Sequence, residues 1–306
     1  MRGNMQDSKS AEAGYLYAAI TLLIWSGFVI ISRLGGKGAL TAYDIAALRT
    51  GTAAVVLSPW WLPRLFRPEL RQLRLSQSLS FAVLAGLAYP LLAYAGFFHA
   101  PASHGAVLIS GMLPLFTSIF AFVLLRERPS RVRLAGLLFI IAGVATLFHA
   151  SLQGDGLPSL TGDLLFMSAS LVWALFTVLL KRWQVRAFDV TLGVVAMSAL
   201  IYLPVYLLFL PKHMDIASAN EIALQAFFQG FVVVCVAMWT YAKAAEMLGA
   251  VKVAVMMSAV PVLGTLLSVP FLQEPLTAGA ALGVAITFMG ALLGALAKPS
   301  SVTRSS

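Results

Sequence analysis

The chain has 306 residues, of which 60% are hydrophobic and only 11% are charged, whereas an average soluble domain has roughly 25% charged residues. This composition excludes a water-soluble protein. The net charge of +9 does not indicate a nucleic-acid partner, because the basic residues stand in short clusters between apolar runs. The single cysteine, Cys235, excludes an intramolecular disulfide.

Apolar runs of about 20 residues, the length that crosses a ~30 Å hydrocarbon core as a helix, recur along the whole sequence. The first run lacks a signal-peptide cleavage site, so we expect it to be a retained span. The sequence therefore predicts an all-α integral membrane protein with ten transmembrane helices. The expected spans are 14–33, 43–63, 78–98, 103–125, 132–149, 160–181, 189–209, 221–245, 250–272 and 277–297.

The distribution of lysine and arginine predicts the orientation of these spans. With both termini on one side, that side holds 17 of the 21 basic residues, and the opposite side holds only Arg33, Lys37 and Lys212. Cytoplasmic loops are enriched in these residues. We therefore expect a multi-pass protein of the bacterial inner (cytoplasmic) membrane with both termini in the cytoplasm.

An internal repeat relates the two halves of the chain. Trp25 and Trp173, each three residues before a phenylalanine (Phe28 and Phe176), match at a shift of 148 positions. A shift of 147 positions aligns six further pairs: Tyr94/Tyr241, Ala95/Ala242, Pro114/Pro261, Glu127/Glu274, Gly136/Gly283 and Gly143/Gly290. The chain is predicted to be a duplicated five-helix unit, with a first repeat over 14–149 and a second over 160–297.

Because five is odd, the second repeat must enter the membrane from the opposite side to the first. Such inverted-topology repeats are typical of secondary transporters, which bind substrate near the bilayer midplane between the repeats. Trp25, Phe28, Trp173 and Phe176 are therefore candidates for an aromatic wall of a central cavity. Packing between helices is the alternative interpretation.

Several segments carry a resemblance to a known family. They are IWSGFVIISR, AALRTGTAAVVL and PLFTSIFAFVLLRERPSRVRLAGLLFIIAGVATL, the last repeated as PVLGTLLSVPFLQEPLTAGAALGVAITFMGALL. The chain resembles the drug/metabolite transporter (DMT) superfamily, specifically its EamA family of two tandem domains, and it looks most like the YddG-type amino acid exporters. The resemblance implies an inner-membrane exporter of amino acids or other small metabolites.

Arg49 is the only basic residue placed well inside a predicted span. An intramembrane charge is costly and marks a functional site by default. Its guanidinium is suited to hold a substrate carboxylate through a bidentate contact. The alternative is that Arg49 snorkels outward or binds helix carbonyls.

The acidic residues fall at predicted helix ends or turns. This argues against an embedded carboxylate that would exchange protons for a cationic drug. Glu127 and Glu274 are expected to anchor turns. His99 and His104 stand at an outer turn, where most histidines face water.

Two prolines and two groups of side chains complete the candidate site. Pro114 and Pro261 are predicted mid-helix kinks that act as hinges or face the cavity. The resemblance places the remaining candidates on helices that bound the central cavity: Tyr94, Met112, Trp239, Tyr241, Met256 and Met257. Methionine and aromatic walls with few charges suit a neutral or zwitterionic substrate.

Glycines are expected to hold the last helix of each repeat against its neighbours. Gly279, Gly283, Gly290 and Gly294 form G-x-x-x-G twice, and Gly136 and Gly143 lie on one face of the corresponding helix. Small residues of this kind let helices approach closely.

The leading interpretation is a secondary transporter that moves amino acids or similar metabolites by alternating access. A facilitative channel or carrier for other metabolites is the first alternative. A membrane-embedded enzyme is the second, although the sequence has neither G-x-S-x-G nor H-E-x-x-H. No cofactor and no metal are expected; the expected partners are a small-molecule substrate and the lipid bilayer, and the oligomeric state is left open.

Overall fold

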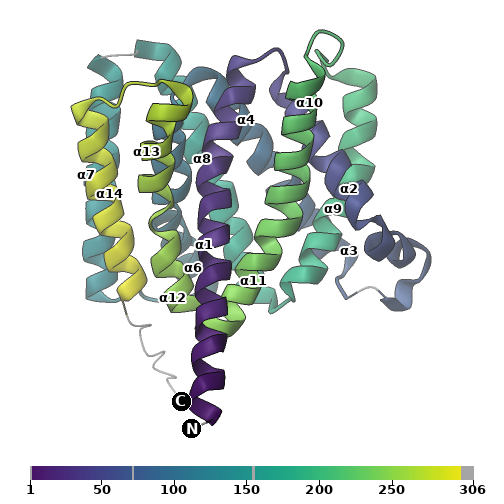
Figure 1. The fold of residues 1–306 in the computed structure, drawn as a ribbon, viewed down its shortest axis with the longest axis horizontal. Coiled ribbons are helices and arrows are strands. Elements are labelled where there is room, and N and C mark those ends of the chain that lie inside the picture. Colours follow the sequence, from purple (N-terminus) through teal and green to yellow (C-terminus); the bar gives the residue numbers. More distant parts are fainter. Residues whose placement is uncertain (1, 71, 154–155, 298–306) are drawn as a thin grey trace.

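The computed structural model describes residues 2–70, 72–153 and 156–297, and these residues form helices without any strand. The helices stand side by side as a bundle (Figure 1). Their bounds are α1 (Arg2–Lys37), α2 (Ala42–Phe66), η1 (Pro68–Leu70), α3 (Leu75–Phe81), η2 (Ala82–Ala88), α4 (Tyr89–His99), α5 (Ala102–Gly105), η3 (Ala106–Gly111), α6 (Leu113–Leu125), α7 (Arg131–Gln153), α8 (Gly156–Trp183), α9 (Ala187–Phe209), α10 (Ala219–Gln225), η4 (Ala226–Val236), α11 (Ala237–Leu248), α12 (Ala250–Met257), α13 (Val260–Leu272) and α14 (Ala278–Leu296).

Nine helical stretches of the described residues are long and apolar enough to cross a membrane. Four of them are composite: α3–η2–α4, α5–η3–α6, α10–η4–α11 and α12–α13. The tenth expected span corresponds to α2, which is 25 residues long. It is not among the nine because Asp44, Arg49 and its threonines make it more polar, so the count of ten remains a prediction.

The first turns of α1 and the last turn of α14 lie at the same end of the bundle, here called the termini end (Figure 1). The opposite end, which holds the α1–α2 and α13–α14 connections, is called the far end. The chain therefore crosses the bundle an even number of times between α1 and α14.

The two halves share one local geometry at a spacing of 147 residues. In the first half the backbone turns at Met112 (φ −79°, ψ −13°) before α6 begins, and in the second half it turns at Ala259 (φ −79°, ψ −10°) before α13 begins. Each of these helices then ends on a left-handed residue, Arg126 or Gln273. The span that precedes each final helix is thus broken in the same place.

The last helices of the halves, α7 and α14, pack against each other through their glycines. A Cβ atom on Gly136 would lie 2.6 Å from the Gly290 carbonyl oxygen, and one on Gly143 would lie 2.7 Å from the Gly283 carbonyl oxygen. Only glycine permits such a close backbone approach. This confirms the expectation that small residues hold these two helices in place.

The remaining helices interlock across the halves. α1 packs on α11 and α13, α4 packs on α8, and α2 packs on η4. The main hydrophobic core therefore draws side chains from both halves, including Phe28, Tyr94, Leu108, Phe166 and Val233. Residues distant in sequence meet at the centre of the bundle.

Candidate functional site

The position of Arg49 is set by the start of α2. Thr41 caps this helix: its side chain accepts from the Asp44 backbone N–H (3.1 Å), and the Asp44 carboxylate accepts from the Thr41 backbone N–H (2.8 Å). This reciprocal capping box satisfies two backbone donors and fixes where the helix begins. Arg49 follows two turns later on the same helix.

The Arg49 guanidinium is within electrostatic range of three side chains from neighbouring helices. It interacts electrostatically with the phenol groups of Tyr89 and Tyr94 on α4 and with the thiol of Cys235 on η4. Among the described residues, its Nη1 atom is fully buried and has no hydrogen-bond acceptor. A buried donor without an acceptor costs about 1–3 kcal/mol, more when it is charged, which makes this atom a candidate contact for an anion.

Aromatic rings extend from this guanidinium across the bundle. Tyr89 packs on Phe28 of α1 (centroids 6.4 Å apart) and on Trp173 of α8 (4.5 Å), and Trp173 packs on Phe176 (4.9 Å). Phe28 also lies 6.1 Å from Tyr94. We call Phe28, Arg49, Tyr89, Tyr94 and Trp173 the Arg49 site.

A chain of buried, hydrogen-bonded polar side chains extends from this site toward the far end; we call Tyr94, Ser32, Gln225 and Gln229 the polar ladder. The Tyr94 hydroxyl donates to Gln229 Oε1 (3.1 Å), and Gln229 Nε2 donates to Ser32 Oγ (3.0 Å). Gln225 Nε2 donates to the Ile31 carbonyl oxygen (2.8 Å). Both glutamines are almost completely buried, so their hydrogen bonds hold α1, α4, α10 and η4 in register.

A second group of predicted site residues lies away from Arg49. Trp25 stacks on Tyr241 (5.2 Å), and Tyr241, Met256 and Met257 pack on a small core formed by α1, α11 and α12. We call Trp25, Tyr241, Met256 and Met257 the Tyr241 cluster. The structure thus divides the single predicted wall into two groups.

Three further candidates lie outside both groups. Phe176 is buried against Phe81 (5.4 Å), and Met112 is buried in the main core at the helix break. Trp239 is 54% exposed and contacts Tyr17 edge to face. Its place in a cavity wall stays a prediction.

Pro114 and Pro261 lie near the middle of their composite spans, directly after the breaks at Met112 and Ala259, as expected for prolines that interrupt a helix. Pro114 lies in the first turn of α6 and Pro261 in the first turn of α13. Proline fits there because its missing N–H would be unpaired in any case. At the first break, Ser170 Oγ donates to the freed Ile109 carbonyl oxygen (2.8 Å). Their role as hinges stays a prediction.

The histidines at the far end have different surroundings. His99 is exposed, as expected. His104 is buried, which contradicts the expectation that it faces water: its Nδ1 atom lies 2.8 Å from Oδ1 of Asp163, a carboxylate with no exposed surface. The sequence placed Asp163 near a helix end but gave no sign that the two would be buried together.

Glu274 and Glu127, the repeat-related glutamates, form ion pairs at opposite ends of the bundle. Glu274 Oε1 lies 2.6 Å from Arg33 Nε and 3.0 Å from Lys37 Nζ, and Glu274 Oε2 accepts from the Ala102 N–H (2.8 Å). Burial acts to raise the pKa of Glu274, but hydrogen bonds from Arg33, the Ala102 N–H and Lys37 outweigh it and lower that pKa. Glu127 pairs with Lys181 (2.7 Å).

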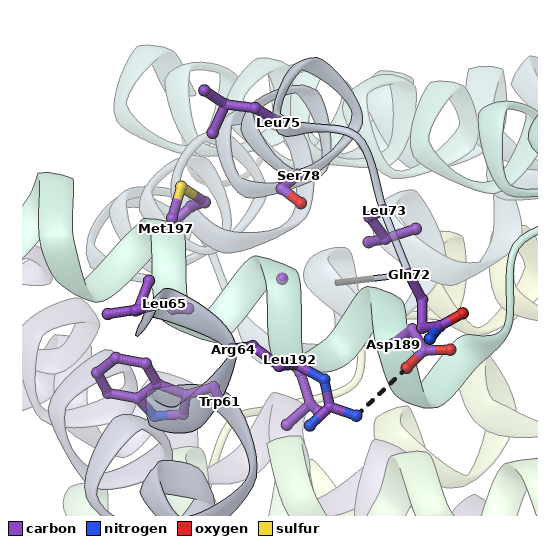
Figure 2. Close-up of a pocket in the computed structure, with 12 residues that line it drawn as sticks. Trp61, Arg64, Leu65, Gln72, Leu73, Leu75, Ser78, Asp189, Leu192 and Met197 are labelled. Carbon is purple, nitrogen blue, oxygen red and sulfur yellow. Dashed lines mark ion pairs between the residues drawn. The ribbon is translucent and has the colours of Figure 1, made fainter. Parts of the chain in front are cut away.

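Neither of two cavities near α2 is lined by a predicted site residue. One, of about 130 Å³, lies at the termini end between α2, the 72–78 segment and α9, where Arg64 and Asp189 pair at 3.8 Å (Figure 2). The other, of about 510 Å³, is an open groove between α2 and α9. Its wall includes Gly51 and Thr52, close to Arg49 in sequence.

Sequence reasoning missed Tyr89, Gln225 and Gln229. Tyr89 joins Arg49 to the aromatic rings but has no tyrosine partner at the repeat spacing, so the repeat did not mark it. The two glutamines lie four residues apart on one helix face. Polar residues inside an apolar run were the available signal, since an intramembrane polar group is rare and usually functional.

Comparison with known proteins gives one family. The model of the EamA-like transporter family matches this chain twice, over residues 12–148 and 160–295. An uncharacterized transporter of Clostridium kluyveri is 22% identical over 92% of this chain and 93% of its own length. The uncharacterized transporter YyaM of Bacillus subtilis is 24% identical over 81% of this chain and 82% of its own.

A solved crystal structure shares the fold. Its chain is 20% identical to this one, the alignment covers 97% of this chain and 99% of the other, and the TM-score is 0.63. At this identity the likeness concerns the arrangement of helices alone.

Proposed function

From the premise that the chain belongs to the EamA-like transporter family and is a multi-pass membrane transporter of small molecules, we propose that it exports neutral or aromatic amino acids, or similar small carboxylates. Transport proceeds by alternating access across a bacterial inner membrane. The far end faces outward and the termini end faces the cytoplasm, in agreement with the distribution of basic residues.

The observation that carries this proposal is the buried Nη1 atom of Arg49, which has no acceptor among the described residues. A guanidinium binds a carboxylate through two parallel hydrogen bonds, and this contact strengthens where water is excluded. The adjacent rings of Phe28, Tyr89 and Trp173 suit an apolar or aromatic side chain. A zwitterionic amino acid matches both features.

The fold supports the alternating-access part of the proposal. α2 serves as the tenth span, and the two five-helix halves are inverted repeats, 14–149 and 160–297. The broken spans at Met112 and Ala259 resemble the discontinuous helices at which secondary transporters bind substrate and bend. Pro114 and Pro261 are the hinges at these breaks.

Counterflow into proteoliposomes tests the proposal. Vesicles loaded with unlabelled phenylalanine should accumulate labelled phenylalanine transiently and saturably. Phenethylamine, which keeps the ring and the amine but lacks the carboxylate, should compete at least about tenfold less well than phenylalanine, because it cannot form the charge-assisted contact. Equal competition by the two compounds would remove Arg49 from the proposed role.

The same assay separates the proposal from the channel alternative. A carrier shows overshoot and saturation, whereas an open pore equilibrates without overshoot. Linear uptake that no amino acid saturates would favour a facilitative channel.

A further inference from the structure

We propose that the Glu274–Arg33 and Glu127–Lys181 ion pairs are two equivalent gates, one at each end of the bundle, which close in alternation. The proposal rests on the alternating-access part of the proposed function and adds the residues that perform it. It does not depend on the identity of the substrate.

The first argument is the local geometry of the two glutamates. Each follows directly on a left-handed residue that ends a helix, Arg126 (φ 58°) before Glu127 and Gln273 (φ 54°) before Glu274. A non-glycine residue with positive φ is uncommon and ends the helix sharply. The two carboxylates are therefore presented in the same way at opposite ends of the bundle.

The second argument is the partner that each glutamate binds. Arg33 lies on α1, the first helix of one half, and Lys181 lies on α8, the first helix of the other; the two stand 148 residues apart. Each glutamate comes from the half that its cation does not belong to. Both ion pairs therefore join the two halves and must stretch or break when the halves move apart at that end.

The third argument is the difference in burial between the pairs. At the far end the side chains of Arg33 and Glu274 are only 15% and 11% exposed, whereas at the termini end those of Lys181 and Glu127 are 63% and 34% exposed. Arg33 Nη1 also donates to the Phe97 carbonyl oxygen (2.5 Å), and Lys37 Nζ to that of Leu272 (3.3 Å). The far-end gate is thus tied to four helices, while the termini-end gate consists of one solvated contact.

This asymmetry corresponds to a conformation that is shut at the far end and loosely held at the termini end. An exposed ion pair contributes little stability, whereas a partly buried network with charge-assisted hydrogen bonds contributes more. When the halves move, the Glu127–Lys181 pair should become buried and the Glu274–Arg33 pair should become exposed.

Cysteine labelling in the full-length protein tests the gates. Ser32 is completely buried and directly precedes Arg33, so a Ser32→Cys variant on a Cys235→Ala background reports the opening of the far end. A membrane-impermeant maleimide is added to right-side-out and, separately, to inside-out vesicles, and the labelling rate of residue 32 is measured from each face.

The two glutamates should shift this rate in opposite directions. Glu274→Gln should speed labelling from the far-end face by about tenfold, because one partly buried charged hydrogen-bond network is lost. Glu127→Gln should slow the same labelling by about twofold, as expected for an exposed pair. Equal shifts, or none, would overturn the proposal and leave the glutamates as turn anchors.

A variant that keeps the charge provides the matched control. Exchanging the two charges of the far-end gate would place a cation beside Lys37 and a carboxylate beside the Phe97 carbonyl oxygen, so the control is Glu274→Asp, which keeps the carboxylate. It should keep labelling slow if the ion pair is a gate, whereas a variant that labels fast because it is misfolded will not respond to the retained charge. Since labelling needs no substrate, opposite shifts without any amino acid transport would retain the gates and refute only the substrate assignment.

Discussion

Trp25 and Trp173 occupy corresponding helices of the two halves, yet their surroundings differ. Trp173 packs on Tyr89, which interacts electrostatically with the Arg49 guanidinium. Trp25 stacks on Tyr241, which packs with Met256 and Met257 on a separate small core. The comparison teaches that two tryptophans at matching positions of the sequence can have different surroundings, because Arg49 has no arginine counterpart 147 or 148 residues later.

Replacing Arg49 should cause the largest loss of transport. Arg49→Gln removes the charge, and we expect the counterflow rate constant at low substrate concentration to fall about 100-fold, as for the loss of a buried charged contact of roughly 3 kcal/mol. Arg49→Lys, which keeps the charge without the planar fork, should retain part of the activity. Full transport by Arg49→Gln with normal yield would make the residue architectural.

The second-largest effect should be a difference in KM between the two tryptophan variants. Trp173→Ala should raise the KM for counterflow by about tenfold, the upper range for loss of a specific aromatic contact. Trp25→Ala should change KM by less than about twofold, since its ring contact lies in the Tyr241 cluster, while lowering the thermal unfolding midpoint of the purified protein. Equal changes in KM would show that both clusters contact substrate.

A smaller effect is expected at Tyr94, where a single atom is removed. Tyr94→Phe leaves the buried Gln229 Oε1 without its hydroxyl donor, and the KM should rise about three- to fivefold, as expected for a net loss near 1 kcal/mol. Phe28→Leu, which keeps a buried apolar side chain next to Tyr94, is the matched control for packing. A larger rise in KM for Phe28→Leu than for Tyr94→Phe would show that ring packing contributes more to transport than the hydrogen bonds of the polar ladder.

The smallest effect should come from Trp239. Trp239 is 54% exposed, so Trp239→Ala should leave counterflow unchanged within about twofold, as is usual for substitutions at exposed positions. A strong loss of transport in this variant would return the residue to the site and require α11 to rotate during the cycle.

The regularities of the fold were predictable from residue spacing. The shift of 147 positions relates Pro114 to Pro261 and Glu127 to Glu274, and in the structure it also relates the breaks at Met112 and Ala259. Glycine spacing predicted that α7 and α14 pack closely on neighbouring helices, and the structure shows that they pack on each other. These features follow from local sequence, because a break, a helix end or a glycine face is encoded within a few residues.

The composition of the site was less predictable because it depends on contacts between distant residues. Arg33 and Glu274 are separated by 241 residues, and nothing in either turn indicates the partner. In the sequence Tyr89 is a single tyrosine in an apolar run. Only the packing of α4 on α8 brings it against Trp173. The π-helical turns that precede α4 and α6 were not predicted either, although such turns cluster at functional sites.

The glycine contact between α7 and α14 has a consequence for motion. The carbonyl oxygens of each helix contact the glycines of the other and leave no space for sliding or tilting. We therefore expect α7 and α14 to move as one rigid pair. Its backbone amides should then exchange with deuterium more slowly than those of the broken spans. We expect the other helices to move relative to this rigid pair. A substitution that adds a side chain at one of its glycines would then block the whole transport cycle rather than slow one step.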